Sequence, residues 1–306
     1  MSSIISMKYF STTARIFLSF VLIFMFVASP LVYAQSSAID QKLNETKAGI
    51  DKLLEVKDSI TLSQSEKTKQ EIELKTTLLL NILDLSLAQL NDLSDKVDHV
   101  SFSDTDDWTS IKTSYQQRLA DAIAYYKDLQ KWVLETKKPM TTQEIALGGK
   151  KIADQQSTTV DSLVREVNII LSAFNIDDII SLADGRLEKV GSDVDKIYSN
   201  NLTKNQKLKT LFDSALALVE KSHEQSDRAK EVILHLYDPS QSTSTQAFID
   251  GLGKTLNTST STLSTLVARP LIESYVQDLI FGALDAVKSA YAIFLDMSAN
   301  AKQYLK

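Results

Sequence analysis

The stretch that decides the fold is IELKTTLLLNILDLSLAQLNDLSDKV, residues 72–97. Alternating steps of four and three residues link one set of positions along it: Ile72, Thr76, Leu79, Leu83, Ser86, Leu90, Leu93 and Val97. Six of these eight residues are apolar, so they place a hydrophobic seam on one face of a long helix. Leu74, Leu78, Ile82 and Leu85 lie off that seam. The helix is therefore apolar around much of its circumference, which predicts that other helices surround it.

The composition of the 306-residue chain favours few, long helices. Glycine (8) and proline (4) are scarce, whereas strand-rich folds need many turns built from these residues. The net charge is −6, and because residues 1–34 hold Lys8 and Arg15 but no acidic residue, the remainder carries −8. An acidic body argues against binding of nucleic acid or of an anionic membrane surface. The absence of cysteine excludes disulfides, thiolate metal sites and a cysteine nucleophile.

Residues 1–34 have the pattern of a secretory signal peptide. A positively charged segment is followed by an apolar core, IFLSFVLIFMFV at 16–27, and by Pro30. We expect cleavage between Ala34 and Gln35, because small or tolerated residues precede that bond. An uncleaved membrane anchor is the alternative, although the apolar run is short for a span of ~20 residues. The sequence thus predicts an exported bacterial protein that is secreted, periplasmic or associated with the cell envelope.

After the signal segment, helical periodicity predicts a single elongated all-α domain, residues 35–306, of about seven or eight helices. We expect helices at 36–60, 66–97, 108–137, 141–174, 177–199, 203–237, 246–256 and 270–297, with sub-boundaries near 139–141, 200–203 and 238–246. Several of these helices are much longer than the mean of ~11–12 residues. Such helices pack as an elongated antiparallel bundle, or as an antiparallel coiled coil with a bundle at one end.

Residues that break or cap helices mark the ends of these elements. We expect a break at residues 175–178 and a helix stop at Asn201. Asp106 or Asp107 is a plausible N-cap for the helix that starts at Trp108. Pro270 suits the first turn of the last helix.

The segment around Gly148 and Gly149 combines a helix start with two glycines. Thr141 or Thr142 can cap this helix, with Glu144 in its first turn. Each glycine weakens a helix by ~1 kcal/mol relative to alanine, or allows a kink. The glycines and the lysines that follow lack the spacing of a phosphate-binding loop. We therefore expect a helix defect or a close helix crossing at this point.

Aromatic residues are concentrated in the helix predicted from Trp108. Its seam repeats at steps of three and four residues: Trp108, Ile111, Tyr115, Leu119, Ala122, Tyr126, Leu129 and Val133. Tyr125 and Trp132 are seven residues apart and lie off that seam, which makes them candidates for an exposed contact with a glycan, peptide or partner protein. Packing against a neighbouring helix is the alternative that we favour.

One helical face carries the best cluster of metal-ligating residue types, Glu220, His223, Glu224 and Asp227. The Glu-x-x-His spacing occurs in di-iron bundles, which need a second such motif that this chain lacks. We expect a solvated face here. The acidic run at 104–107 lacks the Gly and Glu that a calcium-binding EF-hand loop requires. No arrangement typical of a nucleophilic triad is present, so the sequence predicts no catalytic, metal or cofactor site.

The general plan of a signal peptide, no cysteine and long helices resembles that of secreted α-helical pore-forming toxins of the cytolysin A and haemolysin BL type. The resemblance is architectural and attaches to no motif. Those proteins carry an extended apolar head segment, and residues 35–260 contain no such segment. Residues 266–297 form an amphipathic helix, yet its acidic residues, such as Asp278 and Asp285, oppose insertion into an anionic surface.

We therefore expect an exported, non-enzymatic helical-bundle protein. It would act through contacts with an unknown protein partner or through self-association, as a scaffold, spacer or adhesin-like envelope module. The alternative is a secreted pore-forming or membrane-active protein that uses the C-terminal amphipathic helix.

Overall fold

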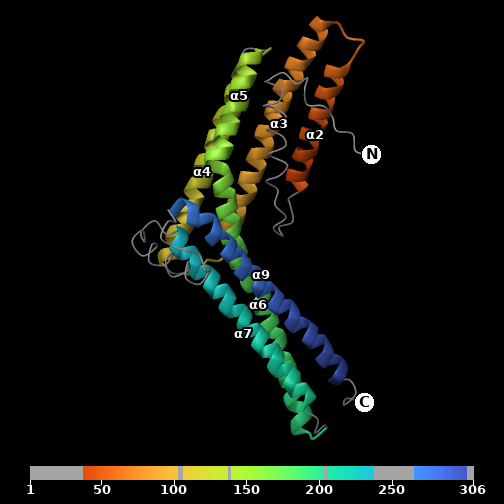
Figure 1. Ribbon diagram of the computed structural model, residues 1–306, viewed down its shortest axis with the longest axis vertical. Helices are drawn as coiled ribbons and strands as arrows, with labels where there is room; N and C mark the ends of the chain where they lie inside the picture. The colour runs from red at the N-terminus through yellow and green to blue at the C-terminus, as the bar shows by residue number, and fades with distance from the viewer. Residues whose placement is uncertain (1–36, 103–105, 137–138, 203–205, 238–264, 302–306) are drawn as a thin grey trace. The chain divides into compact units, whose positions relative to one another are not determined.

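The computed structural model describes residues 37–102, 106–136, 139–202, 206–237 and 265–301. Throughout these ranges the chain is all-helical and contains no strand, which confirms the predicted class (Figure 1). The expected cleavage pair Ala34 and Gln35, residues 104–105 of the acidic run and the expected helix at 246–256 lie outside the described residues.

The described helices are α2 (Ser37–Asp58), α3 (Gln64–His99), α4 (Asp106–Glu135), α5 (Thr142–Gln155), the π-helical turn η2 (Gln156–Val160), α6 (Asp161–Ser199), α7 (Lys207–Tyr237) and α9 (Thr265–Ala301). Because η2 joins α5 to α6 without a break, the described residues form six separate helical stretches. Most ends fall within a few residues of those expected. Asp106 and Asp107 lie inside α4, so the N-cap of α4 is at neither of them.

The helices divide into two compact units. Unit 1 contains α2, α3, α5, η2 and the parts of α4 and α6 that lie in 114–167. Unit 2 contains residues 99–113, α6 from Asn168 onward, α7 and α9.

Helix α3 forms the centre of unit 1. Both of its predicted apolar sets contribute to the core: Leu78, Leu79, Ile82, Leu83, Leu85, Leu90, Leu93 and Val97 are buried. The only polar side chain buried with them on this described helix is Ser86, which donates its hydroxyl proton to the Ile82 carbonyl at 2.9 Å. The predicted seam of α4 is also buried along its whole length, from Trp108 to Val133.

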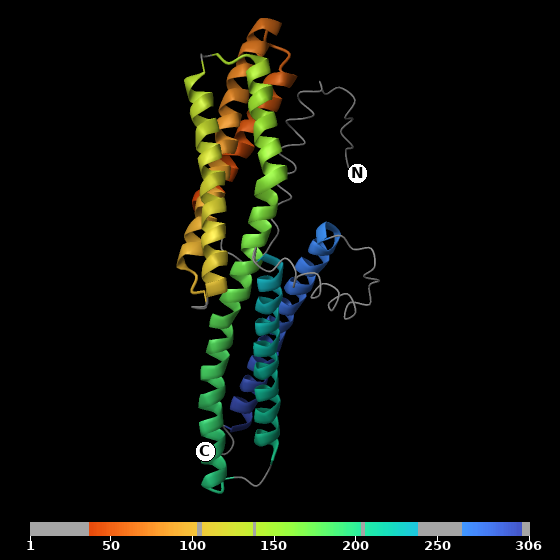
Figure 2. The same cartoon turned by 90° about the vertical axis from the view of Figure 1, so that its left-hand side faces the viewer.

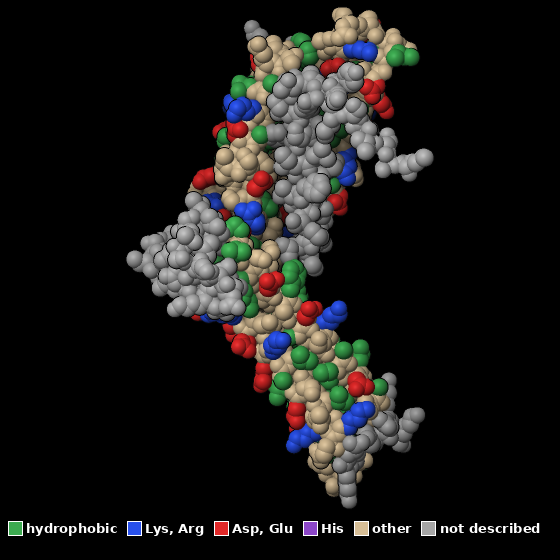
Figure 3. Space-filling view, viewed as in Figure 1, with side chains coloured by type: hydrophobic (Ala, Val, Ile, Leu, Met, Phe, Trp, Pro, Cys, Tyr) green, Lys and Arg blue, Asp and Glu red, His purple; other side chains and the backbone are tan. Residues whose placement is uncertain are grey.

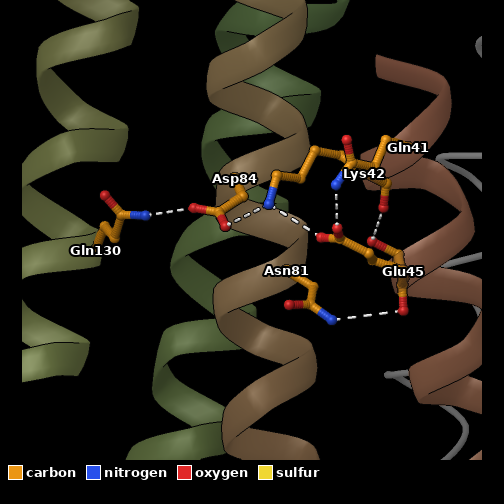
Figure 4. A network of polar contacts seen from close by, with 7 residues as sticks. Gln41, Lys42, Glu45, Asn81, Asp84 and Gln130 are labelled. Carbon is orange, nitrogen blue, oxygen red and sulfur yellow. Dashed lines mark hydrogen bonds and ion pairs between the residues drawn. The ribbon is translucent and has the colours of Figure 1, made fainter. Parts of the chain in front are cut away.

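Neighbouring helices of unit 1 run antiparallel, and polar contacts join three of them. Figure 4 shows Lys42 of α2 reaching Asp84 of α3, while Gln130 of α4 approaches Asp84 from its other side. The Lys42 Nζ atom lies 3.3 Å from Asp84 Oδ2, and Gln130 Nε2 donates to Asp84 Oδ1 at 2.5 Å. Farther along α2, Glu45 accepts from Lys42 at 2.9 Å, and its backbone carbonyl accepts from Asn81 at 3.5 Å. These contacts fix the register of α2 and α4 on α3.

Within unit 2, α6 from Asn168 onward, α7 and α9 lie side by side in both views (Figures 1 and 2). Asp177 of α6 contacts Lys230 of α7, and farther along α6 the ring of Phe212 lies against Gly191, so α6 and α7 are antiparallel. Lys207 of α7 donates to Asn300 of α9 at 3.0 Å, which shows that α9 runs antiparallel to α7.

The break expected at residues 175–178 is wrong, because α6 continues from Asp161 to Ser199. Adjacent aspartates are poor helix formers, but tertiary contacts override this preference here. Ile176 is buried, and Asp177 accepts hydrogen bonds from Ser226 and Lys230. The backbone therefore stays helical where the local sequence favours a turn.

Pro270 was expected in the first turn of the last helix, but α9 begins at Thr265 and places Pro270 inside the helix. Proline lacks the backbone N–H that would bond to residue 266, so one intrahelical hydrogen bond is missing there. The preference of proline for the first turn of a helix therefore predicts a start for α9 that is five residues too late.

Two helix ends have the caps that the sequence predicts. Thr141 caps α5 in a complete capping box with Glu144, and bonding to Thr141 lowers the pKa of the Glu144 carboxyl. At the end of α6, Asn201 adopts a φ of 55°. Its N–H bonds to the Tyr198 carbonyl, and the N–H of Leu202 bonds to the Ile197 carbonyl, as in a Schellman motif.

Candidate functional site

The aromatic pair proposed as an exposed contact packs instead against α5. Tyr125 and Trp132 are both half-buried. The Tyr125 hydroxyl donates to the Lys151 carbonyl at 3.3 Å, and the Lys151 ammonium lies 5.0 Å from the centre of the Trp132 ring. These contacts favour the packing alternative over an aromatic binding strip.

The two-glycine segment is a close helix crossing. A Cβ atom on Gly148 would lie 2.8 Å from Leu79 Cδ2 and 3.2 Å from Trp132 Cζ3. Leu79 is fully buried, so α3 and α5 can approach this closely only where α5 lacks a side chain.

The metal-ligand candidates Glu220, His223, Glu224 and Asp227 all lie exposed on α7. His223 Nε2 is 3.0 Å from Asp184 of α6, and both side chains are about half exposed, at 50% and 44%. Over the part of the chain that the structure describes, no group of three or more His, Asp or Glu side chains is arranged to hold a metal ion. The observed role of His223 is a surface contact between α6 and α7.

A buried carboxylate lies in unit 1, at a position that the sequence analysis does not predict as a site. Glu166 of α6 is 1% exposed and accepts hydrogen bonds from the Tyr115 hydroxyl at 2.8 Å and from Arg118 Nη1 at 2.7 Å. The guanidinium also lies 4.8 Å from the centre of the Tyr115 ring. Both donors bond to Glu166 Oε2, and because a carboxylate that loses water on folding needs such donors, this set fixes α6 against α4.

The π-helical turn contains the second polar contact in the core of unit 1. Tyr126 donates to Gln156 Oε1 at 3.1 Å, and Gln156 Nε2 donates to Asp161 Oδ1 at 2.5 Å. Burial raises the pKa of the Tyr126 hydroxyl well above its ordinary value. Tyr126 is therefore a neutral hydrogen-bond donor and has no access to substrate.

Unit 2 contains a groove of about 520 Å³ near the ends of α6 and α9. Its floor is apolar and comes from α6, the loop after it, the start of α7, and α9: Val190, Val194, Ile197, Leu202, Leu208, Phe294, Met297 and Ala301. The Schellman cap places Leu202 next to Ile197, and both residues line the groove. The volume is within the range of ~300–1,000 Å³ typical of small-molecule sites.

The rim of the groove is mainly basic. Arg186, Lys189, Asp193 and Lys196 follow one another along α6 at steps of three and four residues and all line the groove. Lys196 lies 3.7 Å from Asp193, whereas Arg186 and Lys189 make no hydrogen bond or ion pair with another described residue. This local excess of positive charge stands out in a chain whose net charge is −6.

The outer face of α9 exposes large apolar side chains. Leu271, Phe281 and Leu295 are 46%, 47% and 72% exposed. Figure 3 shows hydrophobic side chains among acidic and basic ones on the side of α7 and α9 turned to the viewer. None of the described helices is both long enough and apolar enough to cross a membrane.

Comparison of the chain with known protein families, with curated proteins and with solved structures finds no match. Neither the groove nor the contacts of Glu166 are predicted from the sequence. One sign of the latter was visible, since Glu166 is an acidic residue within a largely apolar stretch, LVREVNIILSAF at 163–174.

Proposed function

We propose that this chain is an exported, non-enzymatic helical protein that acts through protein–protein contacts, as a scaffold, spacer or adhesin-like module of the cell envelope. The observation that supports this proposal is the outer face of α9. Single exposed apolar residues are common on protein surfaces, but a row of them along one helix face is typical of an interaction site.

Three of the four large apolar residues that the described part of α9 exposes belong to one stripe, and the fourth, Tyr291, lies beside it. Positions 271, 274, 278, 281, 285, 288, 292, 295 and 299 alternate in steps of three and four, and all are exposed. Leu271, Phe281 and Leu295 on this stripe alternate with charged residues, including Asp278 and Lys288. The opposite face is buried in unit 2 through residues such as those at 276, 283 and 290. The stripe thus combines apolar anchors with the charges that set partner choice at helix–helix interfaces.

A photo-crosslinking amino acid placed at Phe281 in the native cell tests this proposal. Mass spectrometry of the adducts would show either a second copy of the chain or another envelope protein. Position 221 provides a matched control, because Lys221 is exposed on α7 of the same unit. Adducts at 281 that are no more abundant than those at 221 would contradict the assignment of this face.

We also propose how the helices pack over the whole chain. The antiparallel neighbours and the three- and four-residue rhythm of the buried seams support elongated, coiled-coil-like bundles within a single domain over residues 35–306. Small-angle scattering of the purified chain measures its dimensions, and a radius of gyration near that of a compact sphere of the same mass would argue against elongation.

Export is proposed from residues 1–34. Intact-mass measurement of the protein purified from an export-competent bacterium would show a mature chain that begins at Gln35. A chain that keeps its first 34 residues and remains with the membrane fraction would support the anchor alternative.

A membrane-active protein is the second candidate. Phe281 and Leu295 are exposed and could enter the interfacial region of a bilayer, although Asp278 and Asp285 lie on the same stripe. Dye release from neutral and anionic liposomes over a concentration series separates the two candidates. Release that depends on Phe281 and Leu295 would favour membrane action.

A further inference from the structure

We propose that the groove of unit 2 binds a single-chain anionic amphiphile, a free long-chain carboxylate, with its alkyl chain on the apolar floor and its carboxylate at Arg186 and Lys189. This binding function is separate from the protein–protein contacts proposed for the exposed stripe of α9. It rests on the shape, the lining and the charge of the groove.

The floor favours an alkyl chain over a polar ligand. Val194, Ile197 and Met297 are each less than 10% exposed, and they form one hydrophobic cluster with Leu208. No acidic side chain contributes to the floor, and the only described acidic side chain at the groove is Asp193 on the rim. A ligand gains free energy here mainly by removing its apolar surface from water.

The length of the groove along α6 suits a chain of moderate length. Arg186 and Ile197 both line the groove and are eleven residues apart on one helix. At ~1.5 Å per residue this separation is ~16 Å, so an extended chain of about ten carbons, which is shorter than this, fits within the groove. Leu202 and Leu208 line the groove together with Ile197, whereas Arg186 and Lys189 lie toward its other end along α6, so we place the charged head group at the end near Arg186.

The charge on the rim selects an anion. Lys196 is close to Asp193, and because both side chains are about 70% exposed, at 69% and 73%, their interaction is weak. Arg186 and Lys189 lie on the same side of α6, three residues apart, and no described carboxylate pairs with either. Two adjacent unpaired cations attract a carboxylate and disfavour a cationic head group.

Titration calorimetry of the whole protein with decanoate, below the concentration at which decanoate forms micelles, tests this proposal. The expected result is saturable binding of one decanoate per chain. Decan-1-ol, which has the same chain length and no charge, should bind more weakly. The double substitution Arg186→Glu and Lys189→Glu should weaken decanoate binding by about tenfold or more and leave decan-1-ol binding unchanged.

Two further variants control for folding and for net charge. Lys221→Glu alters an exposed lysine of α7 away from the groove and should leave decanoate binding unchanged. Ser298→Trp places a large ring over the groove from an exposed position and should reduce the binding of both ligands. Unchanged circular dichroism of each variant shows that the fold is intact.

Three results would overturn the proposal. The first is the absence of saturable decanoate binding, and the second is equal binding of decanoate and decan-1-ol that the charge reversals do not alter. The third is binding that appears only after removal of residues 302–306, which would identify the chain's own C-terminus as the occupant. Crosslinking from position 281 does not depend on the groove, so failure here and failure of the proposed function remain distinguishable.

Discussion

The Lys230 ammonium on α7 donates a hydrogen bond to the Asp177 carboxylate on α6 at 2.6 Å. Ser226, one turn before Lys230, donates to the same carboxylate at 2.9 Å. Lys230 also lies 5.4 Å from the centre of the Phe174 ring, so its charge interacts with both an anion and an aromatic face of α6.

Replacement of Asp177 by alanine should therefore destabilise unit 2. Because the Asp177 side chain is 45% exposed, we expect a loss of about 1 kcal/mol in the free energy of unfolding, below the value for a buried charged hydrogen bond. Asp178→Ala is the matched control, since Asp178 is exposed and removal of a poor helix former there should be neutral or stabilising. Urea denaturation of the two variants measures the difference, and equal stabilities would show that the Asp177 contacts contribute nothing.

Removal of Arg118 should destabilise unit 1 more strongly, because the buried Glu166 carboxylate would lose the guanidinium that lies 2.7 Å from it. We expect Arg118→Ala to lower the free energy of unfolding by about 2 kcal/mol, less than for a fully buried pair because Arg118 is 39% exposed.

Glu166→Leu in the Arg118→Ala background should restore part of this loss, since it removes the unpaired charge as well. Chemical denaturation of the single and double variants gives the coupling energy between the two residues. A double variant that is less stable than Arg118→Ala would contradict this account.

Gly148→Ala should lower the melting temperature, although alanine is the better helix former. Its Cβ would meet Leu79 and Trp132, and the buried Leu79 has little room to move. Gly185→Ala is the control. A Cβ at Gly185 would have no atom within 4 Å, so this change should stabilise α6 by about 0.5–1 kcal/mol. Thermal unfolding followed by circular dichroism would refute the close crossing if both variants were stabilised.

Tyr126 makes the stability of unit 1 sensitive to alkaline pH. Burial raises its pKa above the ordinary value of 10.0, so above pH 10 the unfolded chain loses this proton while the folded chain keeps it. The Tyr126 hydroxyl makes its full contribution to the free energy of unfolding below pH 10. Above pH 10 this free energy falls as the pH rises, by at most ~1.4 kcal/mol per pH unit.

Tyr126→Phe should remove this part of the decrease in unfolding free energy at alkaline pH. Tyr125→Phe provides the comparison, because it removes a neighbouring hydroxyl that is half-buried. Urea midpoints measured from pH 8 to pH 11 give the slope for each protein. Identical slopes for the wild type and Tyr126→Phe would show that this hydroxyl is not the titrating group.

Periodic packing was the most predictable part of this structure. The seams of α3 and α4 were predicted residue by residue, because a helix face that contacts other helices needs apolar side chains every three or four positions. Local caps such as Thr141 and Asn201 were predictable for the same reason, since their side chains and φ values act within one turn.

Features that depend on partners far along the chain were not predictable. The local sequence around Asp177 favours a turn, but in the structure Lys230 bonds to it and the helix continues. Glu166 has the residue type of a surface acid, and only its contacts with Tyr115 and Arg118 account for its burial. The groove combines residues from three helices, none of which is unusual in its own segment.

The π-helical turn changes the spacing of the buried residues on either side of it. Along α5, η2 and α6 the buried residues Ile145, Ile152, Val160, Val167 and Phe174 are separated by seven residues, except for a step of eight between Ile152 and Val160. The Asp161 N–H bonds to the Gln156 carbonyl, five residues back, and so takes up the additional residue without turning the seam away from the core. Deletion of one residue from η2 should therefore leave the same buried residues at a uniform seven-residue spacing and allow an uninterrupted α-helix through this position.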